Sequence, residues 1–335
     1  MGGHFWAHIA TWTFLCSVRV VRTDQDLEQD FDLNILPDVT KVNISQDEYV
    51  RMMTTYLHRL RDSADHDAVV PDLKIFDAEQ NTWRRRKKCI TRLKFPKMRL
   101  NPNTDIEQAE LRMLMSEFPD AEAPVIQIYQ IIGLRRRRLI EERQAYLSTN
   151  ASKWCEFDIT NGVRAWLLNG DRNFSLELQC SQCNTSVLQP LQVALSILGY
   201  SDKRRVRRAS PYHDNNQQGG RTDCTTNSAK QRCCRHSLTV SFKDLKVPQI
   251  SSIIQPKSYE AGFCKGRCPY NYNHATNHSR IQSLVHKLDR KAVPRVCCAP
   301  SKLAPLDILR VDPYDFTKLN VEKWDNMRVL ECACS

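Results

Sequence analysis

The sequence predicts a chain of two domains: a β-rich, mixed α/β N-terminal domain, followed by a small all-β C-terminal module knotted by disulfides and carrying one α-helix. Three observations predict this class. Nine of the fourteen cysteines lie in the last third of the 335 residues. Short apolar runs alternate with polar turns over residues 72–186, as strands do. A basic run and a polar linker at 203–223 separate the two patterns.

The first element of the N-terminal domain is expected to be an amphipathic helix, with Ser45 as its cap. Large apolar side chains recur at spacings of three and four residues within residues 47–61. They are Met52, Met53, Tyr56, Leu57 and Leu60. This face would either belong to the core of its own domain or cover an apolar surface of the C-terminal module.

The rest of the N-terminal domain is expected to be mostly strands. Alternating or continuous apolar residues predict strands at 125–129, 154–159 and 174–178, and residues 160–168 predict a short helix.

The spacing of the C-terminal cysteines permits a closed ring. Two parallel disulfides, Cys264 to Cys332 and Cys268 to Cys334, would join a C-x-G-x-C segment to a C-x-C segment. The ring would hold eight residues, five from one segment and three from the other. Gly266 leaves room inside it and tolerates backbone angles that other residues resist.

A third disulfide from Cys298 would thread this ring. Adjacent cysteines rarely bond each other, because the geometry is strained, so Cys233 and Cys234 should have different partners. We group Cys233 and Cys298 with the knot, and Cys224 and Cys234 outside it. Spacing alone leaves open whether Cys224 pairs with Cys233 or with Cys234.

An odd number of cysteines leaves one without an intrachain partner, which suggests a bond between subunits. We assign this role to Cys297. A zinc site is the competing interpretation, but the nine-cysteine region has no C-x2-C spacing, and the pair Cys180 and Cys183 is isolated upstream. We therefore expect no metal and no other cofactor.

The basic run is interpreted as a processing site. Arg205, Arg207 and Arg208 precede a segment rich in Pro, Gly, Asn, Gln and Asp, where a protease can reach the chain. We expect cleavage after Arg208, so that the released module begins at Ala209. The basic runs at 84–88 and 135–138 offer two further sites, and the second is better explained as a solvated strand end.

Several features indicate export. Residues 1–18 are expected to be a signal peptide, although their apolar run is interrupted and a wrongly defined first exon would look the same. Nothing approaches eighteen uninterrupted apolar residues, which argues against an internal membrane span. Five sequons offer glycosylation sites: Asn43, Asn150, Asn173, Asn184 and Asn277.

The C-terminal module is expected to hold strands at 237–242, 306–311 and 327–332 and a helix starting after Ser279. One face of that helix is apolar. It consists of Ile281, Leu284, Val285 and Leu288. Because so small a module has little core to cover this face, we expect it to be buried against a second copy of the chain.

The net charge is +11, of which residues 209–335 carry +8. A basic balance can indicate nucleic acid, but in a disulfide-rich exported module it more often indicates a solvated face or acidic glycans. The cations are dispersed along the chain, so glycan binding is a secondary expectation and nucleic acid is not expected.

The C-terminal motifs resemble the transforming growth factor-β superfamily of secreted ligands. The segments that carry the resemblance are Cys233-Cys234-Arg235-His236, Tyr259-Glu260-Ala261-Gly262-Phe263-Cys264-Lys265-Gly266-Arg267-Cys268-Pro269, Cys297-Cys298-Ala299-Pro300-Ser301-Lys302-Leu303 and Glu331-Cys332-Ala333-Cys334-Ser335. Residues 154–167 resemble the prodomain of this family. The nine-cysteine pattern is similar to the activin, transforming growth factor-β and Maverick-type branches.

The resemblance implies a precursor with a prodomain at 19–208 and a mature growth factor at 209–335. It implies a two-fingered cystine-knot homodimer that bridges type I and type II receptor serine/threonine kinases, with a prodomain helix clamping the ligand. An extracellular cystine-knot antagonist or structural binding protein is the alternative. An enzyme is not expected, because no nucleophile, phosphate-loop or metal-ligand motif occurs in the sequence.

Overall fold

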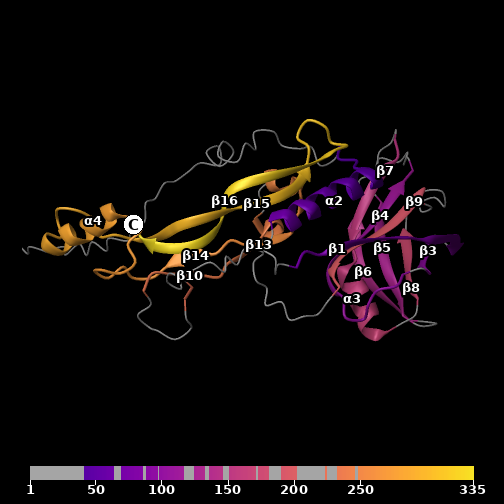
Figure 1. The fold of residues 1–335 in the computed structure, drawn as a ribbon. Coiled ribbons are helices and arrows are strands. Elements are labelled where there is room, and N and C mark those ends of the chain that lie inside the picture. The colour runs from indigo at the N-terminus through magenta and orange to yellow at the C-terminus, as the bar shows by residue number, and fades with distance from the viewer. Residues whose placement is uncertain are drawn as a thin grey trace, which may run out of the picture.

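The two predicted parts differ in architecture: the N-terminal domain is a sheet sandwich, and the C-terminal module is an elongated set of hairpins that extends away from it (Figure 1). The computed structural model describes residues 41–63, 69–85, 88–96, 98–116, 124–132, 136–145, 151–170, 173–180, 190–201, 223–224, 232–245 and 248–335. The expected signal peptide lies outside these residues.

The strands of the N-terminal domain form two antiparallel sheets. The four-stranded sheet has the order β1-β9-β4-β7, and the five-stranded sheet has the order β2-β3-β8-β5-β6. The strands are β1 (Asp72–Asp77), β2 (Glu79–Arg85), β3 (Lys88–Phe95), β4 (Asp105–Met115), β5 (Val125–Ile132), β6 (Arg136–Gln144), β7 (Lys153–Asp158), β8 (Phe174–Cys180) and β9 (Gln192–Tyr200).

Apolar side chains from both sheets meet in one core. Leu111 and Leu195 come from the four-stranded sheet and Phe95 and Ile128 from the five-stranded sheet, and all four are buried. Helix α3 (Thr160–Asn169) adds Trp166 to the same cluster. Sandwich cores of this kind follow from alternating inward-facing residues on each strand.

Most of the elements predicted for this domain are confirmed. The predicted strands fall in β5, β7 and β8, and the predicted short helix is α3. The basic run at 135–138 is also explained as expected, since Arg136, Arg137 and Arg138 are exposed at the start of β6.

Helix α2 (Gln46–Ser63) confirms the predicted amphipathic helix. The Ser45 hydroxyl accepts a hydrogen bond from the Glu48 amide at 3.2 Å, which satisfies one of the free donors at the start of the helix. Its buried residues are Tyr49, Met52, Met53, Tyr56 and Leu57. In Figure 1 the helix lies between the sandwich and the C-terminal hairpins.

The C-terminal module contains two elongated hairpins. In the first, β10 (Cys234–His236) pairs with β14 (Phe263–Lys265), and β11 (Thr239–Ser241) pairs with β13 (Ser258–Glu260). In the second, the long strands β15 (Cys298–Val311) and β16 (Leu319–Cys334) pair with each other, and β12 (Ile253–Gln255) joins the edge of β15.

The boundaries of two elements were predicted wrongly. The strand expected at 237–242 is shorter at both ends: β11 begins at Thr239 and ends at Ser241. The 3-10 helix η1 (Phe242–Leu245) follows, and the buried Phe242 ring stacks on Tyr259 with centroids 5.3 Å apart. A second 3-10 helix, η2 (Pro248–Ser252), leads into β12.

The C-terminal helix α4 (Asn277–Leu288) begins earlier than expected. Its cap is Thr276, which forms a reciprocal capping box with Ser279. Within the part of the chain that the structure describes, no helix has both the length and the hydropathy needed to cross a membrane.

Candidate functional site

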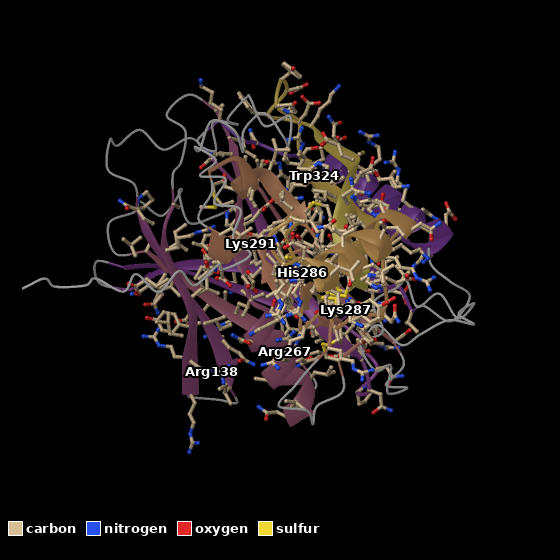
Figure 2. The ribbon with its side chains drawn as sticks, turned by 90° about the vertical axis from the view of Figure 1, so that its left-hand side faces the viewer. Arg138, Arg267, His286, Lys287, Lys291 and Trp324 are labelled. Carbon is tan, nitrogen blue, oxygen red and sulfur yellow. A yellow bond between two sulfur atoms is a disulfide. The ribbon has the colours of Figure 1, made fainter. Side chains whose placement is uncertain are left out.

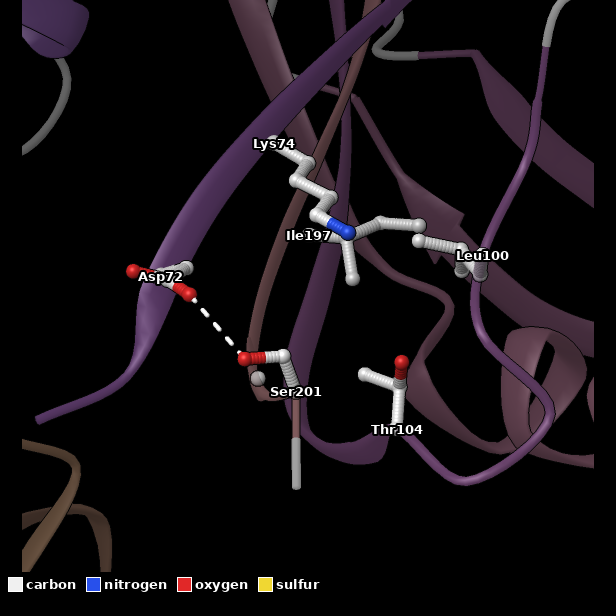
Figure 3. Close-up of a pocket in the computed structure, with 7 residues that line it drawn as sticks. Asp72, Lys74, Leu100, Thr104, Ile197 and Ser201 are labelled. Carbon is white, nitrogen blue, oxygen red and sulfur yellow. Dashed lines mark hydrogen bonds between the residues drawn. The ribbon is translucent and has the colours of Figure 1, made fainter. Parts of the chain in front are cut away.

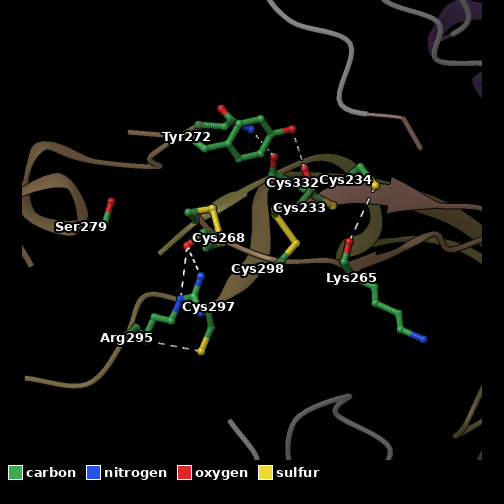
Figure 4. The surroundings of a disulfide bond; sticks show 12 residues. Cys233, Cys234, Lys265, Cys268, Tyr272, Ser279, Arg295, Cys297, Cys298 and Cys332 are labelled. Carbon is green, nitrogen blue, oxygen red and sulfur yellow. Dashed lines mark hydrogen bonds between the residues drawn. A yellow bond between two sulfur atoms is a disulfide. The ribbon is translucent and has the colours of Figure 1, made fainter. Parts of the chain in front are cut away.

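The knot has the predicted disulfides. Cys264 is bonded to Cys332 and Cys268 to Cys334, with Cα atoms 5.6 and 5.7 Å apart. These two bonds close the ring between β14 and the end of β16. Cys233 is bonded to Cys298, with Cα atoms 5.3 Å apart, as the third bond. Figure 4 shows the bond of Cys233 to Cys298 among the surrounding cysteines.

Gly266 is a ring residue that lies against residues 232–233, the segment that carries Cys233 of the third disulfide. Its φ is +135°, a conformation that favours glycine. A Cβ added there would come within 2.8 Å of the Cys233 nitrogen and still closer to the Arg232 carbonyl. The glycine is therefore required both for its backbone angle and for the space that it leaves to residues 232–233.

The structure settles the pairing that spacing left open. Cys224 is bonded to Cys234, so each member of the 233/234 pair has its own partner. Cys297 takes part in a disulfide as well, and so, separately, does Cys180 of the N-terminal domain. The backbone of Cys297 exchanges two hydrogen bonds with Ser335, of 2.7 and 2.8 Å, which fixes Cys297 beside the knot at the end of β16.

The cysteines do not form a metal site in the described part of the chain. Two groups of three ligand-type side chains come close together there, but five of the six members are disulfide-bonded cysteines with no thiolate to offer. Cys155 is a free cysteine buried in the N-terminal domain, and burial raises the pKa of its thiol to about 11.

Helix α2 covers the far end of the second hairpin. Its buried face packs in one apolar cluster with Leu309 and Val311 of β15 and Leu319 of β16, and with Leu198 of β9. The two interpretations of the predicted stripe therefore both hold in part, because the helix lies between its own domain and the C-terminal module.

Hydrogen bonds fix the helix against the hairpin. Arg59 donates to the carbonyl of Val321 at 2.8 Å. At the other end of the helix, the Glu48 carboxylate accepts from the Leu319 amide at 3.2 Å. Just before the helix, the backbone amide of Asn43 donates to the carbonyl of Phe316 at 3.0 Å. Together these contacts hold α2 and the residues before it against the start of β16 and the turn that precedes it.

A buried polar network joins β4 to the connection between β11 and β13, which contains β12 and Lys257. Gln255 donates to Gln108 at 2.6 Å, and Gln108 donates to Glu110. The Glu110 carboxylate also pairs with Lys257 at 3.4 Å and accepts from the hydroxyl of Tyr49 at 3.2 Å. Buried polar groups need such partners, so the network specifies how the two parts fit together.

Arg112 lies next to this network and contacts its member Tyr49. It is fully buried, lies over the Tyr49 ring at 4.1 Å, pairs with Glu156 at 2.9 Å and donates to the Ile44 carbonyl at 2.8 Å. Burial, together with the carboxylates of Glu110 and Glu156, raises the pKa of Tyr49 well above its usual range. Tyr49 therefore remains a neutral donor to Glu110 at physiological pH.

The predicted apolar face of α4 points away from its own chain. Ile281 is 58% exposed and Leu288 is 88% exposed, and Leu284 and Val285 are only partly buried. The helix turns Ser279 and Ser283 inward instead. A helix that buries serines and exposes isoleucine and leucine has an unfilled apolar surface.

The remaining predicted site residues are the processing site and the sequons. The processing site, Arg205 to Ala209, lies outside the described residues, as do the sequons at Asn150 and Asn184. Asn173 and Asn277 are exposed. The Asn43 side chain is engaged, since it donates to the Ser152 carbonyl at 3.1 Å and accepts from the Trp154 amide at 2.9 Å.

Sequence reasoning missed the polar network and a small pocket in the N-terminal domain. Figure 3 shows this pocket, where the Ser201 hydroxyl donates to Asp72 at 3.4 Å near Lys74, Leu100 and Ile197. Its lining brings together no set of side chains that suggests chemistry. The polar network had one weak signal, the polar residues Gln108, Glu110 and Arg112 among the apolar residues of β4.

Comparison with known proteins agrees with this architecture. The family model "TGF-beta propeptide" matches residues 20–212, and the family model "Transforming growth factor beta like domain" matches residues 232–334. The first match alone spans more than half of the chain. The chain therefore belongs to the transforming growth factor-β superfamily and is a ligand precursor of it, and we call its two parts the prodomain and the growth-factor domain.

Curated relatives point to the same family. The chain is 29% identical over 282 residues to the transforming growth factor beta-2 proprotein of Bos taurus, covering 69% of this chain and 66% of the relative. It is 28% identical to the protein of the same name from Mustela putorius furo, with the same coverage. The alignment thus spans just under two thirds of these relatives.

The ring glycine yields the first prediction. Gly266→Ala should block formation of the knot, because the new methyl group collides with the backbone at residues 232–233. The expected result is loss of secreted protein, or secreted protein with free thiols detected by alkylation. Gly170→Ala is the control, since Gly170 also has a positive φ, +68°, but nothing within 4 Å of an added Cβ. Normal disulfides in Gly266→Ala would contradict the threaded arrangement.

The α2 face yields the second prediction. Met53→Asp with Leu57→Asp should weaken association of the cleaved prodomain with the growth-factor domain by at least about 100-fold, since burial of each side chain contributes about 1.5–3 kcal/mol. Size-exclusion chromatography of the cleaved complex at decreasing concentration measures this. Thr54→Asp with His58→Asp, on the exposed face of the same helix, is the matched control. Equal dissociation of the two variants would show that the packing face has no special role.

Proposed function

We propose that the chain is the secreted precursor of a disulfide-linked dimeric growth factor that signals by assembling type I and type II receptor serine/threonine kinases. In this proposal residues 1–18 are the signal peptide, residues 19–208 the prodomain and residues 209–335 the mature growth factor. Export is also consistent with the disulfide content, because disulfides persist in oxidising compartments.

One observation carries the dimer: the exposed apolar face of α4. Ile281, Leu284, Val285 and Leu288 form a continuous stripe, and the described residues of the same chain leave it open. Isologous contact with a second copy would remove this surface from water. Asn277, the first residue of the helix, lies at the end of the same stripe, so a glycan there would have to project past the edge of the dimer.

The covered hairpin supports latency. The apolar cluster and the hydrogen bonds to β16 occupy the second hairpin, and the Gln108–Gln255 network occupies β12, in the connection between β11 and β13 of the first hairpin. A prodomain that covers both hairpins competes with any receptor that uses them. In the proposal, cleavage after Arg208 separates the chain, and loss of the prodomain exposes the receptor-binding surfaces.

An extracellular cystine-knot antagonist or structural binding protein is the alternative function. It would share the knot and the dimer but would not activate receptors. The prodomain match favours a ligand, since a latent precursor needs a part that covers its active surface. The family is one of growth factors rather than enzymes, which agrees with the expectation that the chain has no catalytic activity.

The third prediction tests signalling. Conditioned medium from cells that express the chain should activate a receptor-kinase transcriptional reporter, and Arg205→Ala with Arg208→Ala should leave the precursor uncleaved and abolish the response. Arg136→Ala with Arg138→Ala, in the exposed basic start of β6, is the control and should signal normally. A cleaved, correctly folded growth factor that activates no receptor and instead blocks other ligands would favour the antagonist.

The fourth prediction concerns the link between subunits. Nine cysteines cannot all pair within one growth-factor domain, and Cys297 lies beside the knot. The proposal requires its bond in the single chain to be replaced by one to the second subunit. Cys297→Ser should run as a monomer on non-reducing gels while still being secreted, and Cys155→Ser should remain a dimer. A covalent dimer in Cys297→Ser would assign the link to another cysteine.

A further inference from the structure

The positive charge of the growth-factor domain is concentrated at one end. Residues 261–302 contain eight lysines and arginines and a single acidic residue, Asp289, whereas residues 303–335 contain four cations and six carboxylates. Lysines and arginines thus occur throughout the domain, and the net positive charge is concentrated in residues 261–302 because acidic residues are scarce there. The basic stretch includes α4 and residues 289–296, which connect α4 to Cys297. The acidic stretch includes most of the second hairpin.

The fold gathers cations from three separate segments around residues 268–272. The Arg232 guanidinium lies over the Tyr272 ring at 5.2 Å, and Arg232 bridges to Arg267 through the backbone. The Lys287 ammonium lies over the Tyr270 ring at 4.3 Å. From the other side, Arg295 donates to the Cys268 carbonyl at 2.9 Å.

Two more cations follow α4 directly. Arg290 and Lys291 lie in the turn that folds back on the helix, where His286 shares a hydrogen bond of 2.9 Å with the Val293 carbonyl. We call the whole set the basic cluster. It comprises Arg232, Arg267, Lys287, Arg290, Lys291 and Arg295, all of them exposed. Figure 2 shows Arg267, Lys287 and Lys291 at the end of the module that faces the viewer.

The basic cluster has no counter-charge among the described residues, since none of their carboxylates forms an ion pair with it. The nearest acid in sequence, Asp289, accepts a hydrogen bond from the Lys291 amide at 2.8 Å. Exposed cations that lie near one another repel, and the repulsion is relieved when a polyanion binds.

The cluster also stays open in the proposed dimer. On α4, the cluster residue Lys287 lies on one flank of the helix, about 110° from the centre of the apolar stripe at 100° per residue. Burying the stripe against a second copy therefore leaves this flank and the following turn in solvent. Two copies would present two such clusters on one molecule.

We infer that the basic cluster is a binding site for a sulfated glycosaminoglycan. Lys and Arg side chains suit sulfate and carboxylate groups repeated along a chain. The inference rests on the proposed secretion, because sulfated glycans are the abundant polyanions outside cells and nucleic acids are not. A protein partner is less suited, since protein interfaces are depleted in lysine and have an apolar centre.

Salt-dependent binding of the secreted full-length chain to immobilised heparin tests this. The variant Lys287→Gln/Arg290→Gln/Lys291→Gln removes three cluster cations that make no contact with the knot. The matched control Lys243→Gln/Lys318→Gln/Lys323→Gln removes three exposed cations elsewhere in the domain. The cluster variant should elute at lower NaCl, and the slope of log Kd against log[NaCl] should fall by about two to three, as expected when each lost ionic contact releases about one fewer counterion.

Desulfated heparin and single-stranded DNA complete the experiment. The proposal predicts weak binding to both at physiological salt. Equal losses in the two triple variants would show a net-charge effect, and DNA binding as tight as heparin binding would show an unspecific polyanion surface; either result would overturn the proposal. Because heparin binding needs no receptor, it can succeed or fail independently of the signalling reporter.

Discussion

The growth-factor domain depends on the ring closed by Cys264–Cys332 and Cys268–Cys334. A module with two thin hairpins has little apolar interior, and its knot cluster consists largely of the cysteines themselves with Val296 and Val329. Disulfides of about 2–4 kcal/mol each compensate for that missing core. The ring also fixes geometry, because it holds the base of both hairpins and the start of the α4 segment at one point.

The hairpins and α4, which extend from the ring, expose apolar surface because the module has too little core to cover them. The hairpins cannot bury both faces, and α4 cannot cover its own apolar stripe, so each needs a surface from outside the module. The prodomain supplies one through α2, which packs on Leu309, Val311 and Leu319. In our proposal the second copy of the growth factor supplies the other. The shortage of core that makes the disulfides necessary thus also makes the module a binding protein.

Local patterns in the sequence predicted what local geometry determines. The C-x-G-x-C and C-x-C spacings are sufficient to propose the ring, and the three- and four-residue spacing around Met53 and Leu57 is sufficient to place α2. The network of Gln108 and Gln255 was beyond reach, since these residues are 147 positions apart and each is an ordinary polar residue in isolation. The sequence could not show that Cys224 pairs with Cys234 and not with Cys233, because these adjacent cysteines differ by only one residue in their distance from Cys224. The structure was needed to decide between them.

Disulfide mapping of the secreted, processed protein tests the account most directly. Digestion under acidic conditions followed by electron-transfer fragmentation can separate the bonds of the adjacent residues Cys233 and Cys234. The account predicts Cys264–Cys332, Cys268–Cys334 and Cys233–Cys298, with Cys224 bonded to Cys234. Recovery of Cys234 bonded to Cys298, or of either ring disulfide with exchanged partners, would contradict the threaded ring and the arrangement of hairpins and helix built on it.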